Sequence, residues 1–214
     1  MENNENNPDA CALSPEDLRS APRFTLLICS AKLICDSGEY LCVIRDVSAS
    51  GVRLRIFHPL APHERFQLEL ATGDRFEIDR VWEAQDHAGF RFADWINVQH
   101  FIAEASPYPK RALRLRLDFG ATITTDGGVA PATVRDLSRE GARIETSVPL
   151  AIRQKVKLAA DALPALTGTV CWRSSSAYGL AFQQVFTFEE LARLAAKLQP
   201  FDQPHRPDTS RRYA

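Results

Sequence analysis

The residues with the clearest chemical potential form a short pattern that occurs twice. D-x-S-x-x-G starts at Asp46 and again at Asp136, with arginines upstream of each copy. Guanidinium groups match the oxygens of anions such as phosphate, and Asp and Ser side chains shape tight turns by bonding to nearby backbone. Gly51, the last residue of the first copy, is expected to adopt positive φ there. This combination indicates an anion clamp. It includes no nucleophile paired with a base, so an enzyme is not expected.

The two copies belong to a longer internal repeat. Trp82 and Trp172 share the spacing of the two motifs, as do Gly89 and Gly179, so a unit of about 90 residues occurs twice. With 214 residues, 45% hydrophobic and 25% charged, the chain has apolar material for two small domains. The expected organisation is a disordered tail over 1–13, a first domain over 14–105, a second over 106–199 and a disordered tail over 200–214.

Each unit must position its motif with short strands. Alternation of apolar and polar residues predicts strands near 24–35, 40–45, 52–56, 66–70, 75–83 and 89–93, and then near 113–124, 129–135, 142–146, 155–159, 166–173 and 178–182. Six closely spaced antiparallel strands close most readily into a small barrel. The predicted fold class is therefore mainly β, with two tandem six-stranded antiparallel barrels, each followed by an α-helix.

The two helices have different start signals. In the first unit, Asp94 is expected to cap a helix that places Trp95, Val98 and Ile102 on one face. In the second, Thr187 and Glu190 fit a capping box, and the leucines at 191, 194 and 198 follow at helical spacing.

These features together resemble the PilZ domain. The resemblance rests on R-x-x-x-R before the first strand (Arg19 and Arg23), D-x-S-x-x-G after the second, and a six-stranded barrel; it covers about residues 14–105 and again 106–199. It implies binding of the bacterial second messenger cyclic di-GMP (c-di-GMP), with the arginines on phosphate and guanine and the Asp-Ser loop on the guanine edge and backbone. The implied ligand residues of the first unit are Arg19, Arg23, Asp46, Ser48 and Gly51.

The chemistry of these residues agrees with that implication. A guanidinium matches phosphate oxygens and the O6/N7 edge of guanine, and a carboxylate can accept from guanine N1–H and N2–H. The arginine segment precedes the first strand, where it can fold over the barrel mouth, so ligand binding would order it and change the shape of the protein. The apolar Leu18 stands where a further arginine could hold a second nucleotide, which favours one nucleotide per site.

The second unit departs from the pattern. Its upstream residues read K-x-x-x-R, with Lys110 in place of the first arginine, Arg111 beside it, and Arg114. Lysine cannot form the bidentate fork but can still meet a phosphate as a point charge. Three alternatives follow for the site formed with Asp136, Ser138 and Gly141: weak binding, binding through Arg111, or a structural relic.

Other residues favour structural roles. Trp82 and Trp172 are expected to be core or interface aromatics rather than base-stacking platforms, and Arg53, Arg55 and Arg143 are expected to face solvent, although one or more could reach a ligand at the barrel mouth. The histidines lack metal-ligand spacing, and the five cysteines include no C-x-x-C pair.

Composition limits the partners and the compartment. The net charge of −1 gives no basic face for nucleic acid, and no apolar run is long enough to insert into a membrane. The polar first residues do not form a signal peptide, so the expected location is the cytoplasm.

Two functions remain after these exclusions. The leading one is a non-catalytic c-di-GMP receptor without a cofactor, which signals to an unknown downstream protein. The alternative is a PilZ-type adaptor with an idle nucleotide site, acting through protein contacts in motility, pilus or envelope machinery.

Overall fold

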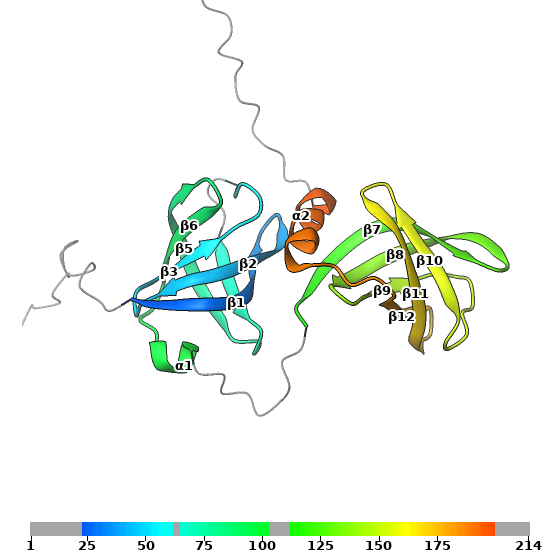
Figure 1. Ribbon diagram of the computed structural model, residues 1–214, viewed down its shortest axis with the longest axis horizontal. Helices are drawn as coiled ribbons and strands as arrows, with labels where there is room; N and C mark the ends of the chain where they lie inside the picture. The colour runs from blue at the N-terminus through cyan, green and yellow to red at the C-terminus, as the bar shows by residue number, and fades with distance from the viewer. Residues whose placement is uncertain (1–22, 62–64, 103–111, 200–214) are drawn as a thin grey trace, which may run out of the picture.

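The computed structural model describes residues 23–61, 65–102 and 112–199, and these residues form two closed barrels of six antiparallel strands (Figure 1). The first contains β1 (Phe24–Cys35), β2 (Gly38–Val47), β3 (Gly51–Arg55), β4 (Phe66–Leu70), β5 (Arg75–Ala84) and β6 (His87–Phe92), and α1 (Val98–Ile102) follows. The second contains β7 (Arg114–Thr125), β8 (Gly128–Ser138), β9 (Gly141–Glu145), β10 (Lys155–Ala160), β11 (Leu163–Ser174) and β12 (Ala177–Phe182), and α2 (Phe188–Leu198) follows. The predicted fold class is confirmed.

Both barrels have the same strand order. The first runs β1-β2-β3-β6-β5-β4, with β4 pairing back onto β1, and the second repeats this order from β7 to β12. The last strand of each barrel therefore lies between the third and the fifth. This insertion decides which outward-facing side chains meet near the D-x-S-x-x-G turn.

Alternating burial explains why the strands form and where the core lies. In β4, Phe66, Leu68 and Leu70 are buried, whereas the residues between them are only partly buried. The same alternation in β9 buries Ala142 and Ile144. Burial of apolar side chains is the dominant favourable term in folding, and closure of the barrel leaves no sheet edge open to another chain.

Strand register shows where the two copies differ. In β1, a bulge between Thr25 and Cys29 holds one more residue than the corresponding bulge in β7. A bulge adds residues to one strand without moving its partner. Residues ahead of the bulge are therefore displaced by one from the repeat spacing, and Arg114, not Leu113, takes the place that Arg23 has in the first barrel.

Helix α1 begins later than the sequence indicated. Its cap is Asn97, whose Oδ1 accepts a hydrogen bond from the His100 backbone N at 3.1 Å. The prediction that Asp94 caps this helix and that Trp95 lies on its face was wrong. The reason is a backbone hydrogen bond of 3.0 Å from Ile96 N to Ala49 O, which holds the preceding residues against the β2–β3 turn.

The capping box of α2 is confirmed. Thr187 Oγ1 accepts from Glu190 N at 3.2 Å, and Thr187 N donates to the Glu190 carboxylate at 2.8 Å. These bonds satisfy backbone donors that would otherwise lack partners at the start of the helix. The helix then buries Leu191 and Leu194 in the core of the second barrel.

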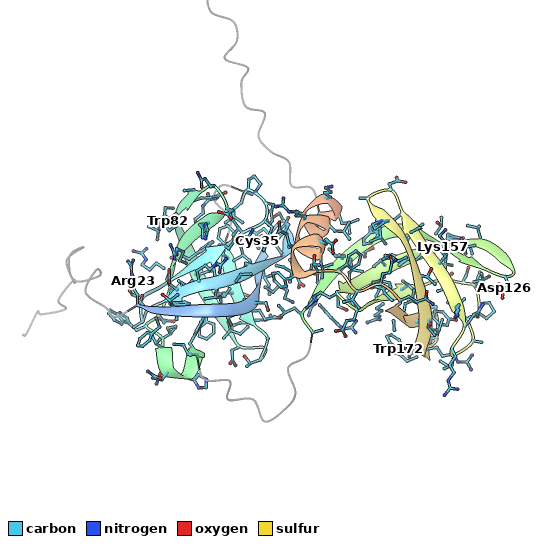
Figure 2. All side chains as sticks on the ribbon, in the orientation of Figure 1. Arg23, Cys35, Trp82, Asp126, Lys157 and Trp172 are labelled. Atoms are coloured by element: carbon cyan, nitrogen blue, oxygen red, sulfur yellow. The ribbon has the colours of Figure 1, made fainter. Side chains whose placement is uncertain are left out.

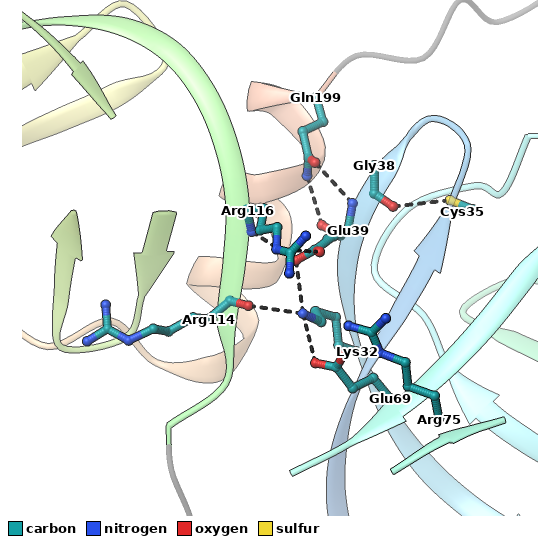
Figure 3. Close-up of polar contacts among 9 residues, drawn as sticks. All are labelled: Lys32, Cys35, Gly38, Glu39, Glu69, Arg75, Arg114, Arg116 and Gln199. Carbon is teal, nitrogen blue, oxygen red and sulfur yellow. Dashed lines mark hydrogen bonds and ion pairs between the residues drawn. The ribbon is translucent and has the colours of Figure 1, made fainter. Parts of the chain in front are cut away.

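Helix α2 also joins the two barrels, between which it lies in Figure 1. Leu41 of β2 belongs to the buried cluster of the second barrel, and the rings of Phe57 and Phe188 meet edge to face with centroids 5.9 Å apart. At the end of the helix, Gln199 accepts from Glu39 N at 3.0 Å and donates to Glu39 O at 2.8 Å (Figure 3). The first barrel thus provides hydrogen-bond partners for Gln199 at the C-terminal end of α2.

A buried ion cluster completes this interface. Lys32, 5% exposed, contacts the carboxylates of Glu39 at 3.0 Å and Glu69 at 2.8 Å (Figure 3). Glu39 Oε2 also accepts from the backbone N of Arg116 at 2.8 Å, and Lys32 donates to the carbonyl of Arg114 at 3.4 Å. The first barrel therefore holds the beginning of β7 by its backbone.

Neither α1 nor α2 has the length and apolar character that a membrane-spanning helix needs, and the described ranges contain no other α-helix.

Candidate functional site

A cavity of about 390 Å³ lies on the outer wall of the first barrel, beside the turn between β2 and β3. This volume is within the range of small-molecule sites. Arg23, Asp46, Ser48 and Gly51 all line it, so the structure brings together four of the five residues that the sequence indicated. The fifth, Arg19, lies outside the described residues. The cavity is on the barrel wall and not over its mouth.

Ser48 shapes the turn that forms one side of the cavity. Its backbone N donates to Gly51 O at 2.8 Å, and its hydroxyl accepts from Gly51 N at 3.2 Å. In the second barrel, the buried Ser138 hydroxyl donates to Gly141 O at 3.1 Å. The serine of the motif is therefore a turn-forming residue in both copies.

Gly51 is required for close strand packing and not for an unusual φ. The expectation of positive φ was wrong, because the positive-φ glycines among the described residues are Gly38, Gly73 and Gly128. A Cβ at Gly51 would lie 2.7 Å from the carbonyl oxygen of Phe90 on β6. Any side chain at this position would push β3 away from β6 and open the cavity wall.

The floor of the cavity is a row of register partners that crosses four strands. Asp46 of β2 lies opposite Arg53 of β3, Arg53 opposite Gly89 of β6, and Gly89 opposite Trp82 of β5. Asp46 forms an ion pair with Arg53 at 2.6 Å and accepts from the Thr25 hydroxyl at 2.9 Å. Arg53 is half exposed as expected of a solvent-facing residue, but it points along this row toward Asp46.

Trp82 was expected to be a core or interface aromatic, and it is not a core residue. It is 44% exposed and lines the cavity, and its indole lies directly over Gly89, where a Cβ would come within 2.1 Å of the ring nitrogen. A bulge between Arg80 and Trp82 changes the alternation of β5 at this point. An apolar residue after a bulge faces outward where simple alternation would place it inside.

The charge around the cavity favours an anion. Three arginines line it, Arg23, Arg53 and Arg91, against the single carboxylate of Asp46. The described lining residues include no histidine or cysteine to act as base or nucleophile. Arginines, one carboxylate and an exposed aromatic ring can bind a ligand that carries both phosphate and a planar base.

The second barrel keeps the same row of register partners. Arg143, Gly179 and Trp172 follow Asp136 in the same register, and Trp172 is also exposed, at 42%. Arg114 forms an ion pair with Asp136 at 2.8 Å. Lys110 and Arg111 lie outside the described residues.

The charged residues of this second copy differ from those of the first. The repeat spacing and the strand register place Ala181 where the first barrel has Arg91, and Glu140 where it has Ser50.

Two arginines are also added in the second copy. Arg139 stands at the place of Ala49, and Arg116 pairs with Asp136 as Thr25 pairs with Asp46. Both have partners: Arg139 Nε donates to the Phe186 carbonyl at 2.8 Å, and Arg116 Nε lies 3.8 Å from the Glu39 carboxylate.

A separate cavity of about 360 Å³ lies on the wall of the second barrel and includes Asp136 and Arg143, but not Arg114, Ser138 or Gly141. Its Arg135 donates to the Glu145 carboxylate at 2.8 Å and to Asp118. The hydrogen bond with Glu145 and the nearby charge of Asp118 raise the pKa of Arg135 although partial desolvation opposes this. Arg135, one of the three arginines that line this cavity, is thus already paired with carboxylates.

Arg91 and Trp82 are the residues that the sequence did not assign to the site, and Arg53 was assigned to it only as one of several candidates. The alternation of apolar and polar residues predicts that the side chains of Arg53 and Arg91 point outward. Their proximity to Asp46 depends on the insertion of β6 between β3 and β5, which no local pattern encodes. Within the described residues, no three His, Cys, Asp or Glu side chains are grouped as a metal site.

Comparison with known proteins gives a family match and several structural likenesses. A family model described as PilZ domain matches residues 17–103 and 109–198. No curated protein matches the sequence.

Three of the similar solved structures contain c-di-GMP according to their titles. The Borreliella burgdorferi PlzA complex is 12% identical, with 77% of this chain and 86% of that chain covered and a TM-score of 0.33. The Escherichia coli YcgR complex is 11% identical, covering 79% and 82%, with a TM-score of 0.31. The K. pneumonia MrkH complex is 15% identical, covering 85% and 87%, with a TM-score of 0.31, and MrkH is described as a transcription regulatory factor. At these sequence identities and TM-scores, the similarity to solved structures adds nothing to the argument from the geometry of the cavity.

Proposed function

Because the chain belongs to the PilZ domain family, with one domain in each half, we propose that it is a non-catalytic c-di-GMP receptor whose ligand site is the cavity of the first barrel. The observation that carries the proposal is the convergence of Arg23, Asp46, Arg53 and Arg91 on that cavity.

The chemistry of the cavity fits the two parts of such a ligand. Arginines can hold the phosphates or the O6/N7 edge of guanine through paired N–H donors. The Asp46 carboxylate can accept from guanine N1–H and N2–H. Asp46 contacts Arg53 and Thr25, so a guanine would replace these donors with its own N1–H and N2–H.

The second barrel is a weaker candidate for the same ligand. Its copy of the site has Ala181 in place of Arg91, and the cavity beside Asp136 is not lined by Arg114, Ser138 or Gly141. Of the three alternatives drawn from the sequence, the geometry therefore supports the structural relic best, and we expect one ligand site per chain.

The site also has a position suited to signalling. Arg23 lies at the end of the first barrel remote from the second barrel, and Lys32 and Glu39 at the opposite end hold the interface (Figures 2 and 3). Arg23, just ahead of β1, and the β2–β3 turn both line the cavity, so a bound nucleotide would bridge the start of β1 to that turn. We expect a partner protein to recognise that remote end when it is occupied.

Isothermal titration of c-di-GMP into three forms of the full chain tests the proposal. Wild type should bind with one site. Arg23→Ala should bind about 10- to 100-fold more weakly, because a hydrogen bond to a charged group contributes about 1.5–3 kcal/mol. Arg114→Ala, the matched change in the second barrel, should bind as wild type does.

Two results would overturn the proposal. Absence of both heat and a thermal upshift with wild type at high ligand excess would leave the idle-site adaptor as the function. Loss of binding in Arg114→Ala, with Arg23→Ala unaffected, would place the site in the second barrel.

A further inference from the structure

The carboxylate of Asp46 is held by two residues that leave the arginine ahead of β1 unpaired. Thr25 Oγ1 donates to Asp46 Oδ1 at 2.9 Å, and Arg53 Nη2 lies 2.6 Å from Asp46 Oδ2. Arg23 lines the same cavity, and within the described ranges it forms no ion pair. Both carboxylate oxygens are thus engaged by residues other than Arg23.

In the second barrel, the motif aspartate pairs with the arginine at the start of β7. Arg114 has the place of Arg23 in the strand register, and its Nη1 donates to Asp136 Oδ1 at 2.8 Å. The threonine is replaced: the register partner of Asp136 is Arg116, whose Nε lies 3.8 Å from the Glu39 carboxylate. Where β7 offers no hydroxyl donor, the aspartate and the upstream arginine therefore pair with each other.

A charge on the third strand of each barrel acts in the same direction. Arg143 of β9 has the place of Arg53, and its Nη2 lies 3.8 Å from Glu145 Oε1. The first barrel has Arg55 at the place of Glu145. Side chains two residues apart on a strand share a face, so Arg55 repels Arg53 where Glu145 attracts Arg143. Arg53 is therefore left to pair with Asp46.

We propose that Thr25 is a positioning residue of the ligand site, because its hydroxyl holds Asp46 and so leaves the Arg23 guanidinium free for a ligand phosphate. The inference rests on the proposed function of the cavity, and it adds a residue outside both sequence motifs. A guanine that displaces Thr25 from Asp46 breaks a hydrogen bond from a neutral hydroxyl. A ligand that met an Arg23–Asp46 ion pair would have to break a stronger, charge-assisted bond between two of its own binding groups. Removal of the hydroxyl should therefore weaken binding.

Calorimetric titration of c-di-GMP into Thr25→Val and Thr25→Ser of the full chain tests the inference. Thr25→Val keeps the shape of the side chain and removes the donor, and the position is exposed, so the fold should be retained. This variant should bind about 3- to 20-fold more weakly, the margin by which a charge-assisted hydrogen bond exceeds a neutral one. Thr25→Ser, which keeps the hydroxyl, should bind as wild type does.

The same barrel offers a matched control. Thr72 Oγ1 donates to the carboxylate of Asp74 at 2.9 Å, and neither residue lines the cavity. Thr72→Val removes the same kind of bond and should leave the affinity unchanged. Equal weakening by Thr72→Val and Thr25→Val would overturn the inference.

A double-mutant cycle separates positioning from a general structural effect. Thr25→Val should weaken binding in the wild-type background but have little effect together with Arg23→Ala, because no guanidinium then remains to pair with Asp46. Independent losses that multiply in the double variant would overturn the inference, as would a Thr25→Val variant that binds at least as tightly as wild type. Wild type without binding would overturn the proposed function instead.

Discussion

At the scale of single residues, glycines determine the shape of the site. Gly51 allows β3 to approach the Phe90 carbonyl, and Gly89 allows the Trp82 ring to lie flat on β6. Both positions recur in the second barrel, where Cβ atoms at Gly141 and Gly179 would meet Leu180 O and the Trp172 ring. The repeated glycines are therefore explained by packing in both barrels, whereas the cavity lined by the motif serine and by the arginine ahead of β1 belongs to the first barrel.

Gly89→Ala should displace the indole of Trp82 and weaken ligand binding with little loss of stability. The added Cβ would fall 2.1 Å from the ring nitrogen, and the ring can swing outward because its other face is exposed. Tryptophan emission and calorimetric affinity should change, and the melting temperature should stay close to that of wild type. Gly179→Ala should shift emission but leave affinity unchanged. Unaltered affinity in Gly89→Ala would mean that the ring orientation is irrelevant to binding.

At the scale of elements, local pattern predicted the strands well and missed what depends on neighbouring strands. Alternation located all twelve strands, and β1 and β4 begin and end at the predicted residues. The prediction that Trp82 faces the core failed because a bulge shifts the alternation of β5. The amino-acid composition does not show where a bulge occurs. Asp94 was misread as a cap because a tertiary hydrogen bond holds Ile96 against the turn at Ala49. The repeat itself contained the correct cap, since Asn97 stands at the place of Thr187.

The cap of α2 should have a measurable effect on stability. Thr187→Ala removes the hydroxyl that accepts from Glu190 N, and such substitutions cost about 1 kcal/mol. Urea unfolding should show this loss, and Thr187→Ser, which keeps the acceptor, should restore most of it. A Thr187→Ala variant as stable as wild type would show that the tertiary contacts of the helix make the cap redundant.

At the scale of the whole molecule, the two barrels share one buried interface. Glu39, 8% exposed, binds the Lys32 ammonium and the backbone N of Arg116, so it links a residue of its own barrel to the first residues of β7. The barrels are thus placed relative to one another by contacts between their own residues.

Glu39→Ala should loosen this interface. Loss of hydrogen bonds to a charged group should lower the free energy of unfolding by about 1.5–3 kcal/mol, as measured by urea denaturation. Small-angle scattering should show a larger radius of gyration. Glu77→Ala, which removes an exposed carboxylate of the same barrel, should change neither quantity. An unchanged scattering profile for Glu39→Ala would mean that α2 alone holds the barrels together.

The same cluster should make stability dependent on pH in the acid range. Burial alone would raise the pKa of Glu69, but hydrogen bonds and charge from Lys32 and Arg75 lower it overall. The carboxylate therefore stabilises the protein fully above its unfolded pKa of about 4.3, and this contribution is lost as pH falls through the lower folded value. Glu69→Gln should be less stable than wild type at pH 6, and the difference should shrink below pH 4. A difference independent of pH would exclude this carboxylate as the titrating group.

The central claim is that c-di-GMP binds in the cavity of the first barrel and not at the copy in the second. Hydrogen–deuterium exchange of the full chain, with and without saturating c-di-GMP, tests it without any substitution. Exchange should slow in peptides that cover residues 14–24, which include Arg19 and Arg23, and in those that cover residues 46–53. Peptides covering 136–143 should be unchanged. Protection confined to 136–143, or no protection at 46–53 under saturating ligand, would contradict the account.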